Sequence, residues 1–225
     1  MGNKLKRTII GAFVYASLFL VGCGAKQTES IDREKSETYE KHDNQDTTSE
    51  NKNTEDKKKV ETRENTDFRQ AVWGDDKDLV VKYEGDDYQD QDDTYLYERV
   101  VAGYNAYVFF AFEDDGRLHS GCYTFTDTYS GGSQYITQYN IIKTSLTEKY
   151  GTPYEDEILA LEDQDLVDMA GESKALEYGY VAYRTRWTTD TSDIMLGMIS
   201  ENYDPTIIIK YDDVNYAFNA NTDGL

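Results

Sequence analysis

The sequence predicts an α+β fold, in which an antiparallel sheet of about six strands forms two meanders and two main helices pack on it. Six runs rich in Tyr, Val, Ile and Phe are typical of strands. They come as two groups of three, and each group follows a segment with helical patterning. The Asp115-Gly116 pair between two of the runs is a strong hairpin signal, which favours antiparallel neighbours.

The first helix is expected directly after Trp73, because aspartates crowd the positions that follow. Asp75 suits the N-cap, and Asp76 and Asp78 suit the positive end of the helix dipole. Trp73 is expected to pack back on Leu79 and fix the direction in which the chain enters the helix. The first group of strands then follows an acidic loop, and is predicted at 94–103, 105–114 and 117–126.

The second half of the pattern begins with a long helix predicted at 131–153. Ser133 is the expected N-cap, and Gly151 is the expected end because glycine favours the conformation that terminates helices. Residues 156–178 are predicted to hold one or two short helical turns. The second group of strands is predicted at 178–189, 192–201 and 205–213.

The first 22 residues carry the features of an export signal. A basic start at 1–7 precedes a run of 14 uncharged residues at 9–22, which is shorter than the roughly 20 residues that span a bilayer. The motif Leu20-Val21-Gly22-Cys23 resembles the lipobox of bacterial lipoproteins. In that family the cysteine is alkylated with diacylglycerol and the chain is cut just before it. The resemblance implies a lipidated Cys23; a plain secretory signal cut elsewhere is the alternative.

Three segments follow from this interpretation. Residues 1–22 form the signal peptide, and residues 23–66 form the lipidated cysteine and a polar tether. The tether has too few apolar residues to offset its ordering entropy, so disorder is expected. Residues 67–225 form one acidic domain. The expected location is the extracytoplasmic face of the cell membrane, where acyl chains such as palmitate provide the membrane contact.

The charge of the domain excludes one class of partner. Residues 67–225 contain 32 Asp and Glu against 11 Lys and Arg. Nucleic-acid binding depends on basic residues that neutralise phosphates, so no nucleic-acid partner is expected. A cationic partner remains admissible, although acidity by itself also confers solubility.

A search for catalytic groups yields no enzyme signal. His119 and Cys122 lie three residues apart in a predicted strand, so their side chains are expected on opposite faces unless a bulge intervenes. Cys122 is expected to be a buried, inert thiol, and His119 a surface histidine of the sheet. An envelope hydrolase that uses paired carboxylates is kept as an alternative, although the sequence does not select a pair.

The acidic loop after the first helix is the one candidate for a metal. A calcium ion prefers carboxylate oxygens. The loop lacks the glycine at position six and the closing glutamate of the EF-hand pattern, so a calcium-dependent module is a further alternative and no other cofactor is expected. The candidate calcium ligands are Asp86, Asp87, Asp90, Asp92 and Asp93.

Tyrosine is abundant, with 18 of the chain's 20 tyrosines in the domain. Tyrosine supplies a large contact area at low entropy cost and is common in binding surfaces. Tyr88, Tyr129 and Tyr203 fall in loops or near strand ends and are the candidate ligand-binding residues. The expected function is therefore non-enzymatic binding of an envelope protein or glycan at the cell surface.

The domain also resembles a small uncharacterised domain of Gram-positive lipoproteins. The resemblance covers most of 68–211 and rests on FRQAVWGDDKDLVVKYEG, YNAYVFFAFED, EKYGTP and DIMLGMISENYDPTIIIKY. It implies no known activity and no catalytic residues. This chain has Asp75 and Asp76 where the pattern has Met-Ser, and the role at the start of the helix is retained.

Overall fold

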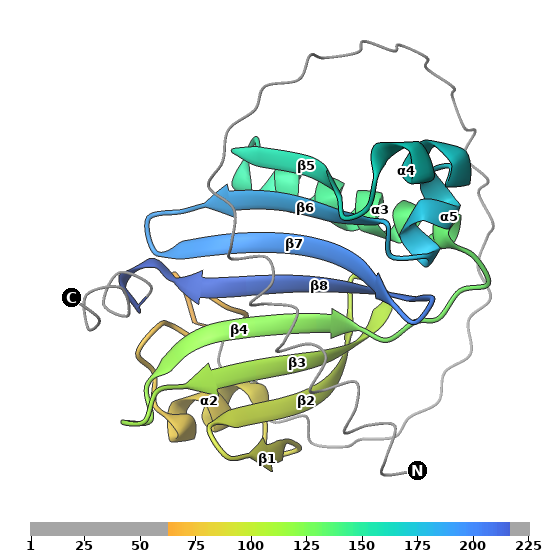
Figure 1. Ribbon diagram of the computed structural model, residues 1–225. Helices are drawn as coiled ribbons and strands as arrows, with labels where there is room; N and C mark the ends of the chain where they lie inside the picture. The colour runs from red at the N-terminus through yellow and green to blue at the C-terminus, as the bar shows by residue number, and fades with distance from the viewer. Residues whose placement is uncertain (1–62, 217–225) are drawn as a thin grey trace, which may run out of the picture.

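The computed structural model describes residues 63–216, which form one eight-stranded antiparallel sheet with helices on one of its faces (Figure 1). The order of the strands is β1-β2-β3-β4-β8-β7-β6-β5. The strands are β1 (Gln89–Gln91), β2 (Thr94–Val101), β3 (Tyr104–Phe112), β4 (Leu118–Phe125), β5 (Glu155–Ala160), β6 (Val181–Thr188), β7 (Ser192–Glu201) and β8 (Asp204–Asp213).

The helices precede and interrupt the two halves of the sheet. α2 (Lys77–Glu84) comes before the first four strands, and α3 (Gly132–Tyr150) comes before the last four. Figure 1 shows both helices behind the sheet, and they share a single hydrophobic core with it. Two short helices, α4 (Gln164–Ala170) and α5 (Glu172–Glu177), connect β5 to β6. The short helical turns predicted for this region are confirmed.

The predicted α+β class, the antiparallel pairing and the two meanders are confirmed, whereas the predicted number of about six strands is wrong. The two additional strands, β1 and β5, are the outer edges of the eight-stranded sheet. β1 is polar throughout, with the sequence Gln-Asp-Gln, and β5 has three acidic residues followed by Ile-Leu-Ala. Neither shows the apolar alternation of a half-buried strand. Short or charged edge strands also resist pairing with other chains.

The two meanders meet at the centre of the sheet, where β4 pairs with β8. Five pairs of residues form this seam, from Ser120 opposite Asp212 to Thr124 opposite Ile208. Every other neighbouring pair consists of strands that follow one another in the chain order of strands. The seam is therefore the long-range contact on which the continuity of the sheet depends.

The main core lies between the sheet and the helices and is rich in aromatic rings. Phe68, which precedes α2, is 1% exposed. Its ring centroid lies 5.1 Å from Phe110, 4.9 Å from Tyr123 and 5.2 Å from Tyr211, on strands β3, β4 and β8. Phe68 thus joins the start of the domain to both meanders.

A second, smaller apolar cluster lies on the other face of the sheet. Strand side chains alternate between the two faces, and the residues that alternate with the main core gather here. The buried members are Ala182, Met195 and Ile208, and Cys122, Leu159 and Ile199 pack against them. None of the helices in the described range shares this cluster.

The helix ends differ in detail from the prediction. Asp76, not Asp75, is the N-cap of α2, and its side chain accepts a hydrogen bond from the Leu79 amide at 2.8 Å. Asp75 is one position too early because it turns back to accept from the Val72 amide at 2.9 Å and to pair with Arg63. Gly131, not Ser133, is the N-cap of α3. Gly151, at φ +83°, ends α3 as predicted.

The chain enters the domain at the end of the sheet where β6 turns into β7. Asp67 accepts a hydrogen bond from Thr191 at 2.6 Å, and Trp73 donates its indole N–H to Ser192 at 2.9 Å. Residues 63–66, predicted to end the tether, already contact the domain through Arg63 and Thr66. The predicted signal peptide, Cys23 and most of the tether lie outside the described residues. Within 63–216, no helix has the length and apolar character needed to span a bilayer.

Candidate functional site

The turn between β7 and β8 presents an exposed tyrosine in an unfavourable backbone conformation. Glu201 pairs with Asp204, so Asn202 and Tyr203 form a two-residue turn. Their φ angles are +53° and +66°, the type I′ arrangement that favours Asn-Gly. A side chain in this left-handed region costs about 1 kcal/mol or more relative to glycine. Tyr203 is nevertheless 74% exposed, so this cost is not offset by burial of its ring.

Tyr203 belongs to a small aromatic group. Its ring packs edge-on against Tyr178, with centroids 5.8 Å apart, and Tyr178 lies 5.5 Å from Tyr180. Tyr178 follows α5 and is 46% exposed. The turn of one hairpin and the end of a helix therefore present two tyrosine faces to solvent side by side.

Two carboxylates flank the same turn. Glu201 and Asp204 are directly opposite each other across the β7–β8 pair, and both are exposed. Like charges in this position repel and destabilise a hairpin. Within the described residues, neither carboxylate takes part in an ion pair. A cation held between them would relieve the repulsion.

More tyrosines lie next to this group, on the loop before α3 and on its first turn. Tyr129 donates its amide to the Tyr135 hydroxyl at 3.1 Å, and their ring centroids are 4.9 Å apart. Burial raises the pKa of Tyr135, and Asp204 acts in the same direction. Burial also raises the pKa of Tyr129, followed by the charge of Asp127. The tyrosine end is defined here as Tyr129, Tyr135, Tyr178, Tyr180 and Tyr203 with Asp127, Glu177, Glu201 and Asp204.

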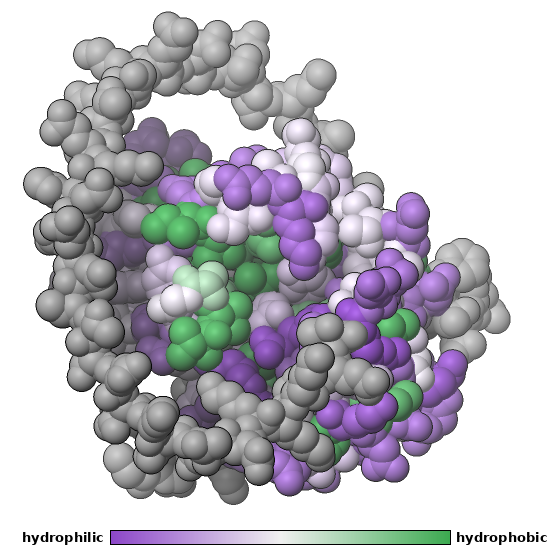
Figure 2. Space-filling view, turned by 180° about the vertical axis from the view of Figure 1, so that it is seen from behind, coloured by the Kyte–Doolittle hydropathy of each residue, from purple (hydrophilic) through white to green (hydrophobic). Residues whose placement is uncertain are grey.

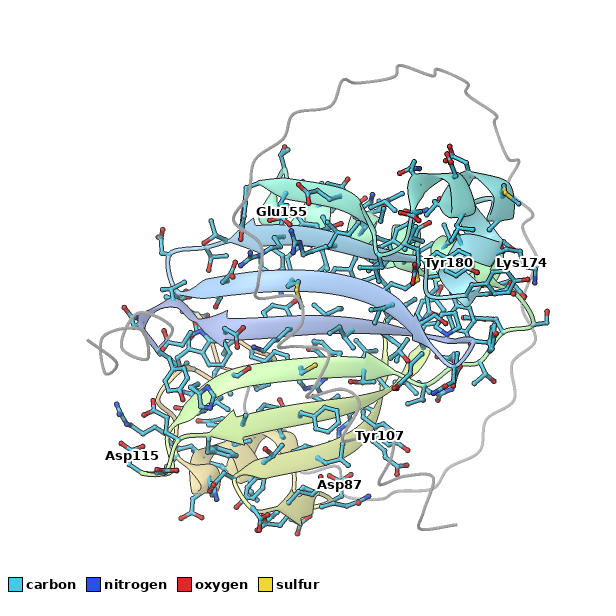
Figure 3. All side chains as sticks on the ribbon, viewed as in Figure 1. Asp87, Tyr107, Asp115, Glu155, Lys174 and Tyr180 are labelled. Carbon is cyan, nitrogen blue, oxygen red and sulfur yellow. The ribbon has the colours of Figure 1, made fainter. Side chains whose placement is uncertain are left out.

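The figures place the tyrosine end at one end of the sheet. Figure 3 labels Tyr180 and Lys174 there, and Asp115 toward the opposite end. Figure 2 shows the helix-bearing side from behind, so this end of the sheet is on the left, and apolar residues reach the surface in a group on that half. The same end of the molecule thus carries carboxylates, exposed aromatic rings and surface apolar groups.

A close contact between helices α3 and α5 holds the tyrosine end together. A Cβ on Gly132 would lie well inside 3.0 Å of the Ser173 backbone oxygen, so only glycine fits this approach. The Gly132 amide donates to Glu177 at 2.7 Å, and the Ser200 hydroxyl donates to the Glu177 carbonyl at 2.9 Å. Glu177 also pairs with Lys174. These contacts connect the start of α3, the end of α5 and the end of β7.

Elsewhere in the domain, a tyrosine ring and a carboxylate together bind an arginine side chain in two places. The Arg99 guanidinium lies 4.6 Å from the Tyr97 ring centroid and donates to Asp87 at 2.8 Å. Arg186 lies 5.5 Å from the Tyr154 ring and pairs with Asp193. Both are cation–π contacts combined with an ion pair. The exposed tip, Tyr203 and Tyr178 with Glu201 and Asp204, offers the same groups.

A pocket of about 390 Å³ adjoins the tyrosine end on the face away from the helices. It lies on the β2–β3 hairpin next to Asp127, which accepts hydrogen bonds from Asn105 at 2.9 and 3.1 Å. The pocket contains one carboxylate, Glu98, directly opposite Tyr107 in the register of the two strands. The residues around it are Glu98, Arg99, Val100, Asn105, Ala106, Tyr107 and Thr126.

The structure brings together two of the three tyrosines predicted as binding residues. Tyr129 and Tyr203 both belong to the tyrosine end. Tyr88 does not, because its ring stacks on Tyr95 at 4.1 Å and packs against the main core. Tyr178, Tyr180, Glu201 and Asp204 were not predicted. One sequence signal was available: Asn-Tyr occupies a hairpin position that favours Asn-Gly.

The aspartates of the acidic loop lie apart from one another in the described structure and have several different partners. Within residues 63–216, no group of three or more His, Cys, Asp or Glu side chains is arranged to hold a metal ion. Asp87 is bound to Arg99, and Asp93 lies 3.6 Å from the Lys77 ammonium. Part of the loop forms β1, whose strand geometry turns Asp90 and its neighbours to alternate sides.

His119 and Cys122 do not form a catalytic pair. The Cys122 thiol donates to the Tyr123 carbonyl at 3.5 Å, and burial raises its pKa to about 12. Burial lowers the pKa of His119, whose ring stacks on Tyr216 at 4.0 Å. Its Nδ1 has no hydrogen-bond partner among the described residues. A bulge between β3 and β4 falls next to His119, so the simple alternation assumed in the prediction does not hold.

The fold and its tyrosine end characterise the chain as an antiparallel α+β domain with an aromatic and acidic surface at one end of its sheet. No protein-family model, curated protein or solved structure matches the chain. The resemblance to a domain of Gram-positive lipoproteins therefore stays a prediction.

Proposed function

We propose that this chain is a lipid-anchored binding protein of the bacterial cell surface, and that its acidic domain captures an envelope partner through the tyrosine end. Cys23 carries the lipid, and the polar segment that follows connects it to the domain. The binding is non-enzymatic. The observation that carries the proposal is the β7–β8 turn, where Tyr203 is exposed at φ +66° between two opposed carboxylates.

This turn combines backbone strain at Tyr203 with charge repulsion between Glu201 and Asp204. A turn that served stability alone would avoid both. Glycine at position 203 would remove the backbone strain, and a neutral residue at position 201 or 204 would remove the charge repulsion. Strained or repelling groups that persist at an exposed tip are typical of functional sites. The adjacent Tyr178 face enlarges the aromatic surface available to a partner.

The lipid anchor is tested by metabolic labelling of the full-length chain in bacterial cells with an alkyne analogue of palmitate. We expect the wild type to incorporate the label and Cys23→Ser to lose it completely, because the thiol is the attachment point. Cys122→Ser is the matched control, since it removes the other cysteine and leaves the motif intact. Label on Cys23→Ser, or its loss from Cys122→Ser, would contradict the anchor.

Partner binding is tested by photo-crosslinking of the full-length protein in intact cells, with benzoylphenylalanine in place of Tyr203. The matched control carries the same residue in place of Tyr154, which is 55% exposed near the β6–β7 turn at the other end of the sheet. We expect a discrete crosslinked product from position 203 and none from position 154. Equal products from both positions would mean random collisions and would overturn the assignment of the site.

A second variant separates binding from folding. Tyr203→Gly relieves the turn strain but loses the ring contact with Tyr178, so we expect its free energy of unfolding to change by less than about 1 kcal/mol. With a crosslinker at Tyr178, we expect this variant to lose most of the product. An unchanged yield would show that Tyr203 does not contribute to capture.

A further inference from the structure

The pocket on the β2–β3 hairpin lies outside the tyrosine end and has a chemistry of its own. Its walls are mixed: Val100 is apolar, and Tyr107 contributes an aromatic ring. Glu98, Asn105, Tyr107 and Thr126 contribute oxygen atoms. Because Glu98, Val100, Asn105 and Tyr107 occupy alternate positions of paired strands, their side chains share one face of the sheet.

The oxygen atoms of this pocket are available to a ligand. In the described part of the chain, the Glu98 carboxylate accepts no hydrogen bond and forms no ion pair. Asn105 uses its amide nitrogen and its backbone to bind Asp127, which leaves its side-chain oxygen as an acceptor. The hydroxyls of Tyr107 and Thr126 add two more acceptors.

One cation borders the pocket, and it is already engaged on the other face. The Arg99 guanidinium donates to both oxygens of Asp87 at 2.8 Å and lies over the Tyr97 ring of the main core. The charge of Glu98 is therefore not neutralised by its neighbour in the strand. Burial raises the pKa of Tyr107, and the Glu98 charge acts in the same direction, which is consistent with the two groups facing each other.

We infer that this pocket binds the side chain of a lysine from a partner polypeptide. An ammonium group has three N–H donors and no acceptor, which matches a carboxylate surrounded by acceptor oxygens. The aliphatic stem of lysine matches the apolar surface of Val100 and the ring of Tyr107. The volume of about 390 Å³ accommodates the whole side chain and part of the adjoining backbone. This inference rests on the proposed binding function and assigns a site next to the tyrosine end.

The inference is tested by ligand-observed NMR with the full-length protein in detergent and the peptide acetyl-Gly-Lys-Gly-amide. We expect a dissociation constant on the order of 1 mM for a single anchored side chain. Glu98→Gln is expected to weaken binding about tenfold or more, because it removes the charge and preserves the shape. Glu148→Gln is the matched control: it neutralises an exposed glutamate on α3, away from the pocket, and should bind like the wild type.

Two further ligands test the chemistry. The same peptide with an acetylated lysine ε-amine should not bind, because it lacks the charge. Glucosamine carries an amine on a sugar ring, and tighter binding of glucosamine than of the lysine peptide would overturn the assignment. Equal affinities of wild type and Glu98→Gln would also overturn it. If the lysine peptide does not bind the wild type while position 203 still crosslinks in cells, the pocket assignment is overturned and the proposed function stands.

Discussion

Replacing Phe68 with alanine is expected to reduce the free energy of unfolding by about 3–5 kcal/mol, the range for removing a buried phenylalanine. The ring is 1% exposed and contacts aromatic residues on three strands from both meanders. Its loss opens a cavity at the seam between β4 and β8. Urea unfolding followed by tryptophan fluorescence measures this change.

The packing around Phe68 also predicts a strong energetic coupling between Phe68 and Gly121. A Cβ on Gly121, in β4, would lie well inside 3.0 Å of the Phe68 ring, so Gly121→Ala alone should cost about 1–3 kcal/mol by overpacking. In the Phe68→Ala background the added methyl enters the vacated space. The double variant should therefore be within about 1 kcal/mol of Phe68→Ala. Simple addition of the two single costs would show that the contact does not constrain the core.

The second large effect is expected at the contact between helices α3 and α5. Gly132→Ala places a methyl against the Ser173 backbone oxygen, and a backbone atom cannot rotate away as a side chain does. The helices must separate, which breaks the hydrogen bond from the Gly132 amide to Glu177. We expect a loss of about 2–3 kcal/mol in the free energy of unfolding. Crosslinking through position 203 should fall as well, because Glu177 and Tyr178 move with α5.

Gly131→Ala is the matched control for this prediction. Its φ of −164° is extended backbone that any residue adopts, and the nearest atom to an added Cβ is Glu177 Oε1 at an ordinary 3.6 Å. Alanine is a poorer N-cap than glycine, so we expect a loss of no more than about 1 kcal/mol, well below that of Gly132→Ala. Equal destabilisation by the two neighbouring substitutions would contradict the close-approach explanation and point to a general loss of helix-start geometry.

The sequence was sufficient to predict the parts of the fold that bury apolar residues in a regular pattern. The six predicted strands and the long helix each show that pattern, and the structure places all of them close to the predicted ranges. β1 and β5 escaped prediction because edge strands do not need a two-sided apolar environment. The wrong cap at Asp75 has a similar origin: two adjacent aspartates suit the role, and the choice depends on the long-range partner Arg63.

The composition of the tyrosine end was predictable only in part, for a physical reason. Tyr203 was selected because loop positions are accessible, and accessibility can be inferred from local sequence. Tyr178 lies next to it only because β6 and β7 pair and α5 precedes β6, which no local pattern reveals. Tyr88 lies away from this group for the same reason. Its loop position suggested a free ring, but folding stacks it on Tyr95.

The place where the chain enters the domain has a consequence for orientation. Asp67 and Trp73 lie beside the β6–β7 turn, whereas the Tyr203 turn is at the far end of β7. Ten strand residues separate the two ends, which corresponds to about 33 Å. The Tyr203 turn therefore lies at the end of β7 away from the segment through which the chain enters the domain. A partner docked on the tyrosine end would not compete for space with that segment.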